Sequence, residues 1–189
     1  MPERPMRADA RRNYERLLSA GAAAFAERGE SASMDEVAKR AGVGAGTLYR
    51  HFPTREDLVE AVYRSGLEEV CARERELLAT AAPGEAFYAW LPVLAAHWRD
   101  CGELKTLMTA LFERDSVAMT ACRELIFAAA GEALADAKAA GTVRDDLEVL
   151  ELLRLLHAAV LAAAPTKGRG SLPLERMLAL VTDGLRPRG

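Results

Sequence analysis

The sequence has few of the residues on which enzyme active sites and metal centres depend. Its three cysteines, Cys71, Cys101 and Cys122, are widely spaced and form no Cys-x-x-Cys pair, which is typical of reduced cysteines in a cytoplasmic protein. His97 and Cys101 lie four residues apart, but two ligands are fewer than zinc sites use. No nucleophile motif, phosphate-binding loop or supported acid pair is present, so we expect no catalytic residues, no metal and no cofactor.

Long apolar runs are also missing. The longest uncharged apolar run, Leu155–Pro165, is well short of the roughly 18 residues that cross a bilayer, and no basic-plus-apolar leader is seen. Half of the 189 residues are nevertheless apolar, which is enough for a sizeable core. We therefore expect a soluble, cytoplasmic protein without a membrane partner.

Charge is unevenly distributed along the chain. Residues 1–55 carry 10 basic and 7 acidic side chains, a net charge of +3, whereas residues 56–189 carry 15 and 21, a net charge of −6. A basic first segment followed by an acidic body is typical of a DNA-binding domain joined to a separate domain, although ordinary scatter of surface charge is the alternative.

Residues 33–52 have the pattern of two short helices joined by a tight turn. Ser33 and Glu36 have the spacing of a capping box at a helix start. Gly42 ends the apolar stripe of that helix, where a left-handed residue is favoured. A second helix is predicted over residues 45–51, with Leu48 and Phe52 pointing inward. This arrangement is a helix-turn-helix, a motif that binds DNA.

The stretch MDEVAKRAGVGAGTLYRHFPTREDL, residues 34–58, resembles the DNA-binding domain of tetracycline-repressor-like (TetR) transcriptional regulators, and the resemblance covers about residues 9–63. It implies an all-α fold with an N-terminal three-helix helix-turn-helix domain and a C-terminal helical domain for ligand binding and dimerisation. One departure is Gly44, where the family commonly has a serine that caps the second helix.

DNA contacts are expected from small residues that allow close approach to base edges and from side chains that donate to phosphates. Arg55 is included because a cation in the first turn of a helix is unfavourable unless an anion is near, and the family uses a basic residue there to hold phosphate. The expected contacts are Ser33, Arg40, Gly44, Ala45, Gly46, Thr47, Tyr49, Arg50, His51 and Arg55.

The remainder of the chain has helical periodicity and no strand pattern. We expect a DNA-binding domain over residues 1–55, linked through a helix at 54–79 to an effector-binding and dimerisation domain over 56–189. Within that second domain, helices are predicted at about 84–100, 102–113, 115–140, 145–164 and 171–186.

Two functional surfaces are expected in the second domain. Large side chains among many alanines could surround an apolar ligand pocket, or could simply be core. The candidate pocket residues are Trp90, Leu94, His97, Trp98, Met108, Phe112, Met119, Phe127 and His157. Apolar stripes on the last two helices predict a four-helix dimer interface, the alternative being packing within one subunit. The candidate interface residues are Leu153, Val160, Leu174, Met177, Leu178, Val181 and Leu185.

Together these features predict a homodimeric DNA-binding transcriptional regulator. We expect a repressor that binds a (pseudo)palindromic double-stranded operator and is released by a small, mostly hydrophobic effector. The alternative is a helical protein-interaction or ligand-binding module without specific DNA binding, and a gel-shift with the upstream DNA distinguishes the two.

Overall fold

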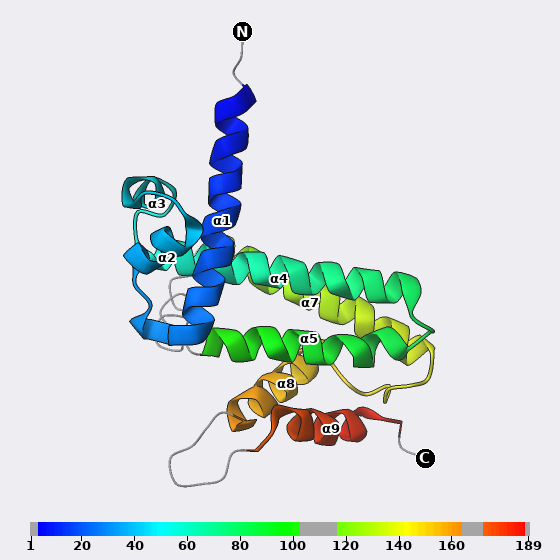
Figure 1. Ribbon diagram of the computed structural model, residues 1–189. Helices are drawn as coiled ribbons and strands as arrows, with labels where there is room; N and C mark the ends of the chain where they lie inside the picture. Colours follow the sequence, from blue (N-terminus) through cyan, green and yellow to red (C-terminus); the bar gives the residue numbers. More distant parts are fainter. Residues whose placement is uncertain (1–3, 103–116, 164–171, 188–189) are drawn as a thin grey trace. The chain divides into compact units, whose positions relative to one another are not determined.

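The computed structural model of the chain describes residues 4–102, 117–163 and 172–187, and these residues form an all-α structure without strands (Figure 1). The helices are α1 (Arg4–Arg28), α2 (Met34–Ala41), α3 (Ala45–His51), α4 (Arg55–Thr80), α5 (Glu85–Gly102), α7 (Val117–Ala139), α8 (Val149–Ala163) and α9 (Leu174–Leu185), with a 3-10 turn, η1 (Gly29–Ser31). The predicted fold class is confirmed. The helix expected at 102–113 lies outside the described residues.

The chain divides into two compact units within α4, between Gly66 and Leu67. We call the first unit, which also includes the start of α7 up to Met119, the head, and the second unit, from Leu67 onward, the body. Helix α4 continues without interruption from one unit into the other, and the boundary expected after Arg55 stays a prediction.

The head is organised around the packing of α1 against α2 and against the first half of α4. Leu17 and Phe25 of α1 are buried, as are Leu48 of α3 and Leu58 of α4. Gly21 allows the close crossing of α1 and α4, because a Cβ there would lie 3.1 Å from a methyl carbon of Val62. Helix α1 begins at Arg4.

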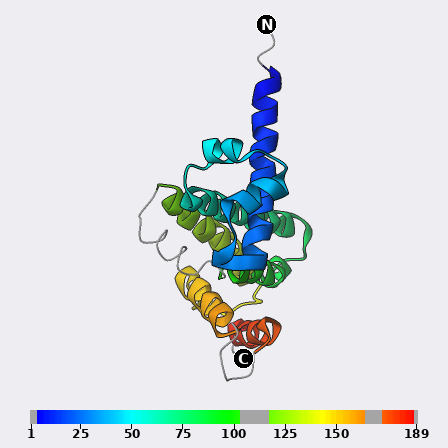
Figure 2. The same cartoon turned by 60° about the vertical axis from the view of Figure 1, so that its left-hand side comes forward.

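The body is built from the second half of α4 and from α5, α7, α8 and α9. Helix α5 packs on α8 and α9, which also pack on each other (Figures 1 and 2). Its buried side chains include Phe87, Trp90 and Leu94, none of which is measurably exposed. The Trp90 indole Nε1 donates to the Val70 carbonyl at 3.0 Å, so the one polar atom of this large side chain is satisfied inside the core.

The turn before α5 is tied to the end of α7. The amide of Gly84 donates to an Asp136 carboxylate oxygen at 2.8 Å, and the Tyr88 hydroxyl donates to the Thr142 carbonyl at 2.7 Å. Gly84 has a φ of 78°, in the left-handed region that favours glycine. No described helix is both long and apolar enough to cross a bilayer.

Candidate functional site

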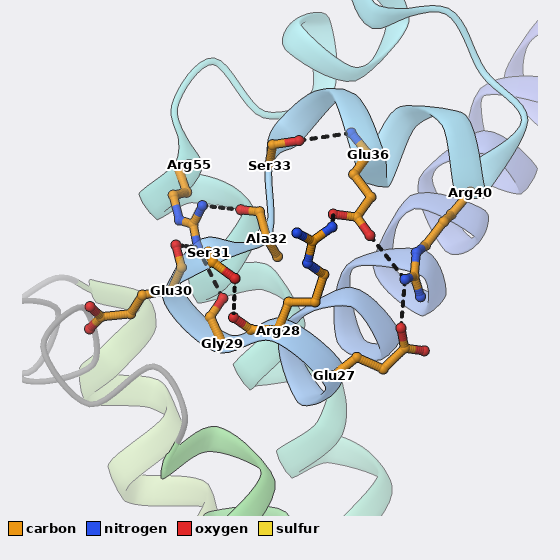
Figure 3. Close-up of polar contacts among 10 residues, drawn as sticks. All are labelled: Glu27, Arg28, Gly29, Glu30, Ser31, Ala32, Ser33, Glu36, Arg40 and Arg55. Carbon is orange, nitrogen blue, oxygen red and sulfur yellow. Dashed lines mark hydrogen bonds and ion pairs between the residues drawn. The ribbon is translucent and has the colours of Figure 1, made fainter.

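Helix α2 starts as the sequence predicts. The amide of Glu36 donates to the Ser33 hydroxyl at 3.2 Å, with Ser33 in an extended conformation (Figure 3). The Glu36 carboxylate, however, accepts from Arg28 at 3.0 Å and from Arg40 at 2.9 Å. Half of the expected capping box is therefore present, and the carboxylate instead ties the α2 start to the end of α1.

The turn after α2 contains the predicted left-handed residue. Gly42 has a φ of 62°, and the amide of Val43 donates to the Ala38 carbonyl at 3.0 Å. Arg16 of α1 donates through Nε to the Ala41 carbonyl at 2.8 Å and through its guanidinium to the Gly42 carbonyl at 2.7 Å. Arg16 thus places a cation at the C-terminus of α2, where it satisfies carbonyls that lack helical partners. The sequence pattern did not identify Arg16 for this role.

Helix α3 presents small and hydrogen-bonding side chains outward. Leu48 and the following Phe52 are buried and hold the helix, whereas Ala45, Gly46, Tyr49 and Arg50 are exposed. Thr47 is half-buried, and its hydroxyl accepts from Arg50 at 3.1 Å. Gly44 caps α3 through its backbone alone, as expected from the missing hydroxyl.

The exposed face of α3 therefore has the features that DNA recognition needs. A Cβ on Gly46 would have no neighbour within 4 Å, so nothing in the described part of the chain obstructs approach there. Tyr49 is 47% exposed, although a large aromatic side chain would ordinarily be covered. Its hydroxyl and the guanidinium of Arg50 are donors suited to phosphate oxygens.

His51 lies at the edge of this face, in an aromatic cluster with Tyr14 and Phe52. Its ring centroid is 5.9 Å from that of Tyr14 and 6.2 Å from that of Phe52. The cluster borders a cavity of about 380 Å³ that Asp57 and Glu60 also line. Arg64 lines the same cavity, so charges of both signs lie beside His51 at this edge of the face.

Arg40 and Arg55, both expected to contact DNA, have structural partners in the head (Figure 3). Arg40 donates to Glu27 at 2.6 Å and to Glu36 at 2.9 Å, and its hydrogen bond to Glu27 lowers the pKa of that carboxyl. The Arg55 guanidinium donates to the carbonyls of Ala32, Gly29 and Glu30 and lies 5.4 Å from the Phe25 ring centroid.

These contacts favour a structural role for Arg55 over the phosphate contact expected from the sequence. Three backbone carbonyls supply the negative partner that a cation at a helix start requires. A reciprocal cap also forms there, because the Thr54 amide donates to Asp57 at 2.9 Å and the Asp57 amide donates to the Thr54 hydroxyl at 3.1 Å. Ser33 is likewise occupied as a helix cap.

Family comparisons cover both units of the chain. Residues 17–62 match the family model described as bacterial regulatory proteins of the tetR family, and residues 82–187 match the C-terminal domain of SbtR-like transcriptional regulators. The second match alone covers more than half of the chain. The chain belongs to the TetR family of transcriptional regulators.

Solved TetR structures resemble this family member over nearly its whole length. A TetR regulator from Streptomyces coelicolor is 34% identical, with 93% of this chain and 99% of that chain covered and a TM-score of 0.76. A TetR regulatory protein from Mycobacterium vanbaalenii is 37% identical, with 96% and 99% covered and a TM-score of 0.71. The expectation of a DNA-binding transcriptional regulator with a helix-turn-helix is confirmed.

Curated relatives match this TetR-family chain only in part. A helix-turn-helix transcriptional regulator from Staphylococcus aureus is 42% identical over 64 residues, which are 33% of this chain and 35% of that protein. The match thus spans about a third of the curated relatives' length.

The candidate pocket residues of this TetR-family regulator do not form one described cavity. Trp90 and Leu94 are fully buried in the body, and Met119 is buried in the head unit. Burial lowers the pKa of His97 to about 4. Trp98 is half-buried and its ring centroid lies 5.4 Å from that of His157, which is exposed. Phe127 is 41% exposed, and Met108 and Phe112 lie outside the described residues, so the pocket stays a prediction.

Most of the candidate interface residues are covered within one subunit. Leu153, Val160, Leu174, Leu178 and Leu185 are buried, whereas Met177 and Val181 are half-buried. Leu155 and Leu180 are 46% and 49% exposed instead. One face of each helix therefore packs into the interior of the protomer, and the exposed leucines Leu155 and Leu180 lie outside it.

Proposed function

We propose that the chain is a homodimeric transcriptional repressor that binds a (pseudo)palindromic operator and leaves it when a small, mostly hydrophobic effector binds. The single observation that supports DNA recognition best is the exposed face of α3, with Ala45, Gly46, Tyr49 and Arg50 outward and Leu48 fully buried behind them. Buried residues fix the helix, so that its outward donors keep one orientation.

Operator binding is tested by fluorescence anisotropy with the DNA upstream of the gene, over a range of salt concentrations. Replacing Arg50 by Ala should weaken binding to all sequences alike and reduce the slope of log K against log salt by about 1, because one phosphate contact is lost. Arg73→Ala, which removes an exposed arginine from the body half of α4, should leave the slope unchanged. Equal slopes for Arg50→Ala and wild type would contradict the assignment.

Dimerisation is proposed through the apolar surface of α8 and α9, which we define as Leu155, Met177, Leu180 and Val181. These residues border a groove of about 780 Å³. Arg144 and Asp146, which pair with each other at 2.6 Å, line the same groove, as do Glu151 and Arg154, whose opposite charges can pair across a two-fold axis. Two α3 helices in the dimer must lie about 34–36 Å apart, or a multiple of this, to enter major grooves on one side of the DNA.

The dimer surface is tested by sedimentation of Leu180→Glu. A charge placed in an apolar interface costs several kcal/mol, roughly enough to separate the subunits, and the exposure of Leu180 allows the protomer to remain folded. Phe127→Glu is the matched control, since Phe127 is an exposed apolar residue of α7 outside this surface. A Leu180→Glu protein that remains dimeric would place the interface elsewhere.

Effector release requires that the effector bind the DNA-incompetent state more tightly. A hundredfold loss of operator affinity needs about 2.7 kcal/mol of such preference. Helix α4 continues from one unit into the other, so a movement of its body half can be transmitted along this helix to the head. Effector release is tested with a lipophilic compound library, screened for thermal stabilisation of the protein and for release of the operator. Compounds that bind without releasing the DNA would refute the proposed effector response.

A further inference from the structure

Glu74 is the only charged side chain that is fully buried among the described residues. It lies on the body half of α4 and is 1% exposed. Neither of its carboxylate oxygens has a hydrogen-bond partner within the described ranges of the chain. Buried polar groups are almost always hydrogen-bonded, because an unpaired one forfeits its interaction with water, so this carboxyl requires an explanation.

The contacts of the preceding helical turn show which face of α4 Glu74 occupies. The Val70 carbonyl accepts a hydrogen bond from Trp90 of α5, and the Cys71 Sγ lies 4.0 Å from the Leu125 carbonyl of α7. Residues three and four positions apart share a helix face, so Glu74 is on the side of α4 that meets α5 and α7. Within the body these helices run side by side (Figures 1 and 2).

Helix α7 has little side-chain bulk in the part that follows this contact. After the buried Ile126 and the exposed Phe127, it continues with Ala128, Ala129, Ala130 and Gly131, and two of the three alanines are buried. Small side chains on one wall and large ones on another, such as Trp90 on α5, are the composition from which apolar ligand sites are formed.

The charges around Glu74 favour a cation as its partner. Glu132, exposed on α7, adds negative potential at the Glu74 carboxyl, and Arg75 is the cation that opposes it. Arg75 is itself exposed, and the nearby Cys71 thiol is held neutral because burial, followed by the charge of Glu74, raises its pKa to about 11. A ligand anion would be repelled, and a neutral hydroxyl could satisfy one oxygen without compensating the charge.

We propose that Glu74 is the polar anchor of an effector site in the body, and that its ligand is an apolar molecule with one protonated amine or amidine group. This inference rests on the proposed function, because it names the chemical class of the effector. The apolar part of such a ligand is buried among the side chains of α5 and α7, and its cationic nitrogen donates to the carboxylate. The charge supplies the specificity, since an uncharged isostere leaves Glu74 unpaired.

The test uses three probes of one shape: 1-naphthylmethylamine, which is cationic, 1-naphthalenemethanol, which is neutral, and 1-naphthoate, which is anionic. Calorimetric titration of the wild-type protein should give at least about tenfold tighter binding for the amine than for the alcohol, and the weakest binding for naphthoate. Glu74→Gln should reduce the affinity for the amine to that for the alcohol. Glu69→Gln, which changes an exposed glutamate of the same helix, should retain the preference.

The comparison of probes on the wild-type protein needs no variant to fold, so it decides the question by itself. Equal affinities for the amine and the alcohol, or no binding of any probe, would overturn the assignment of Glu74. Operator binding is measured separately on the protein without probes. A protein that binds its operator but does not prefer the amine refutes this inference alone, whereas a protein that binds no DNA refutes the proposed function.

Discussion

Replacing Glu74 by Gln should make the protein more stable, and increasingly so as the pH rises. Burial, reinforced by the carboxylate of Glu132 and opposed by Arg75, raises the pKa of Glu74 from 4.5 to about 7. The folded protein therefore binds a proton at Glu74 more tightly than the unfolded chain does. Stability falls as the pH rises between these two values, because the unfolded carboxyl ionises in water while the folded one cannot do so without cost.

The size of the effect follows from the shift in pKa. A shift from 4.5 to about 7 corresponds to about 3 kcal/mol of destabilisation when the carboxyl is ionised in both states. At about pH 5 most of that penalty is absent, so the stability lost between about pH 5 and about pH 8.5 is about 2–3 kcal/mol. Gln has nearly the same shape and does not titrate, so the variant removes the pH-dependent part alone.

Urea unfolding followed by circular dichroism provides the measurement. The free energy of unfolding of Glu74→Gln relative to wild type should increase by about 2–3 kcal/mol between about pH 5 and about pH 8.5. Glu69→Gln is the control, because its exposed side chain should change stability by less than about 0.5 kcal/mol at either pH. If the stability gained by Glu74→Gln is the same at both pH values, Glu74 is not buried as an unpaired carboxyl and the reasoning fails.

Two further predictions concern the head. Arg55→Ala should lower the free energy of unfolding by about 1.5–3 kcal/mol, because hydrogen bonds from a charged donor are lost. The same variant should leave the salt slope of DNA binding unchanged. A slope reduced by about 1 would show that Arg55 contacts a phosphate after all. Gly42→Ala should lower the free energy of unfolding by about 1–2 kcal/mol, because Gly42 has a positive φ. Gly46→Ala should raise it by about 0.5–1 kcal/mol, because Gly46 lies in α3 with open space around its Cβ position. Equal urea midpoints for the two variants would contradict the left-handed turn.

The helix-turn-helix was predictable because its determinants are local. The Ser33 cap, the left-handed Gly42 and the inward Leu48 each depend on residues within about one helical turn, so their spacing in the sequence identifies them. Helix boundaries in the body followed from apolar periodicity in the same way, within a few residues.

The roles of the arginines depended on residues far apart in the chain. Arg16 caps α2 across 25 residues, and Arg55 binds the carbonyl of Ala32, which lies 23 residues before it. A surface cation available to DNA and a cation engaged by backbone carbonyls have the same local sequence pattern. Only the packing of α1 and α4 around the turn shows which of them has partners within the head.

The two faces of α8 show the same limit for apolar residues. Its leucines surround most of the helix, so the sequence predicts that both sides are covered but not by what. The structure covers Leu153 within the protomer and leaves Leu155 exposed. The burial of Glu74 was not predictable from the sequence either, because glutamate is ordinarily a surface residue and the neighbours of Glu74 on α4 include exposed charged residues. Which side of a helix faces the interior is decided by the helices that pack on it, and that is a property of the tertiary structure.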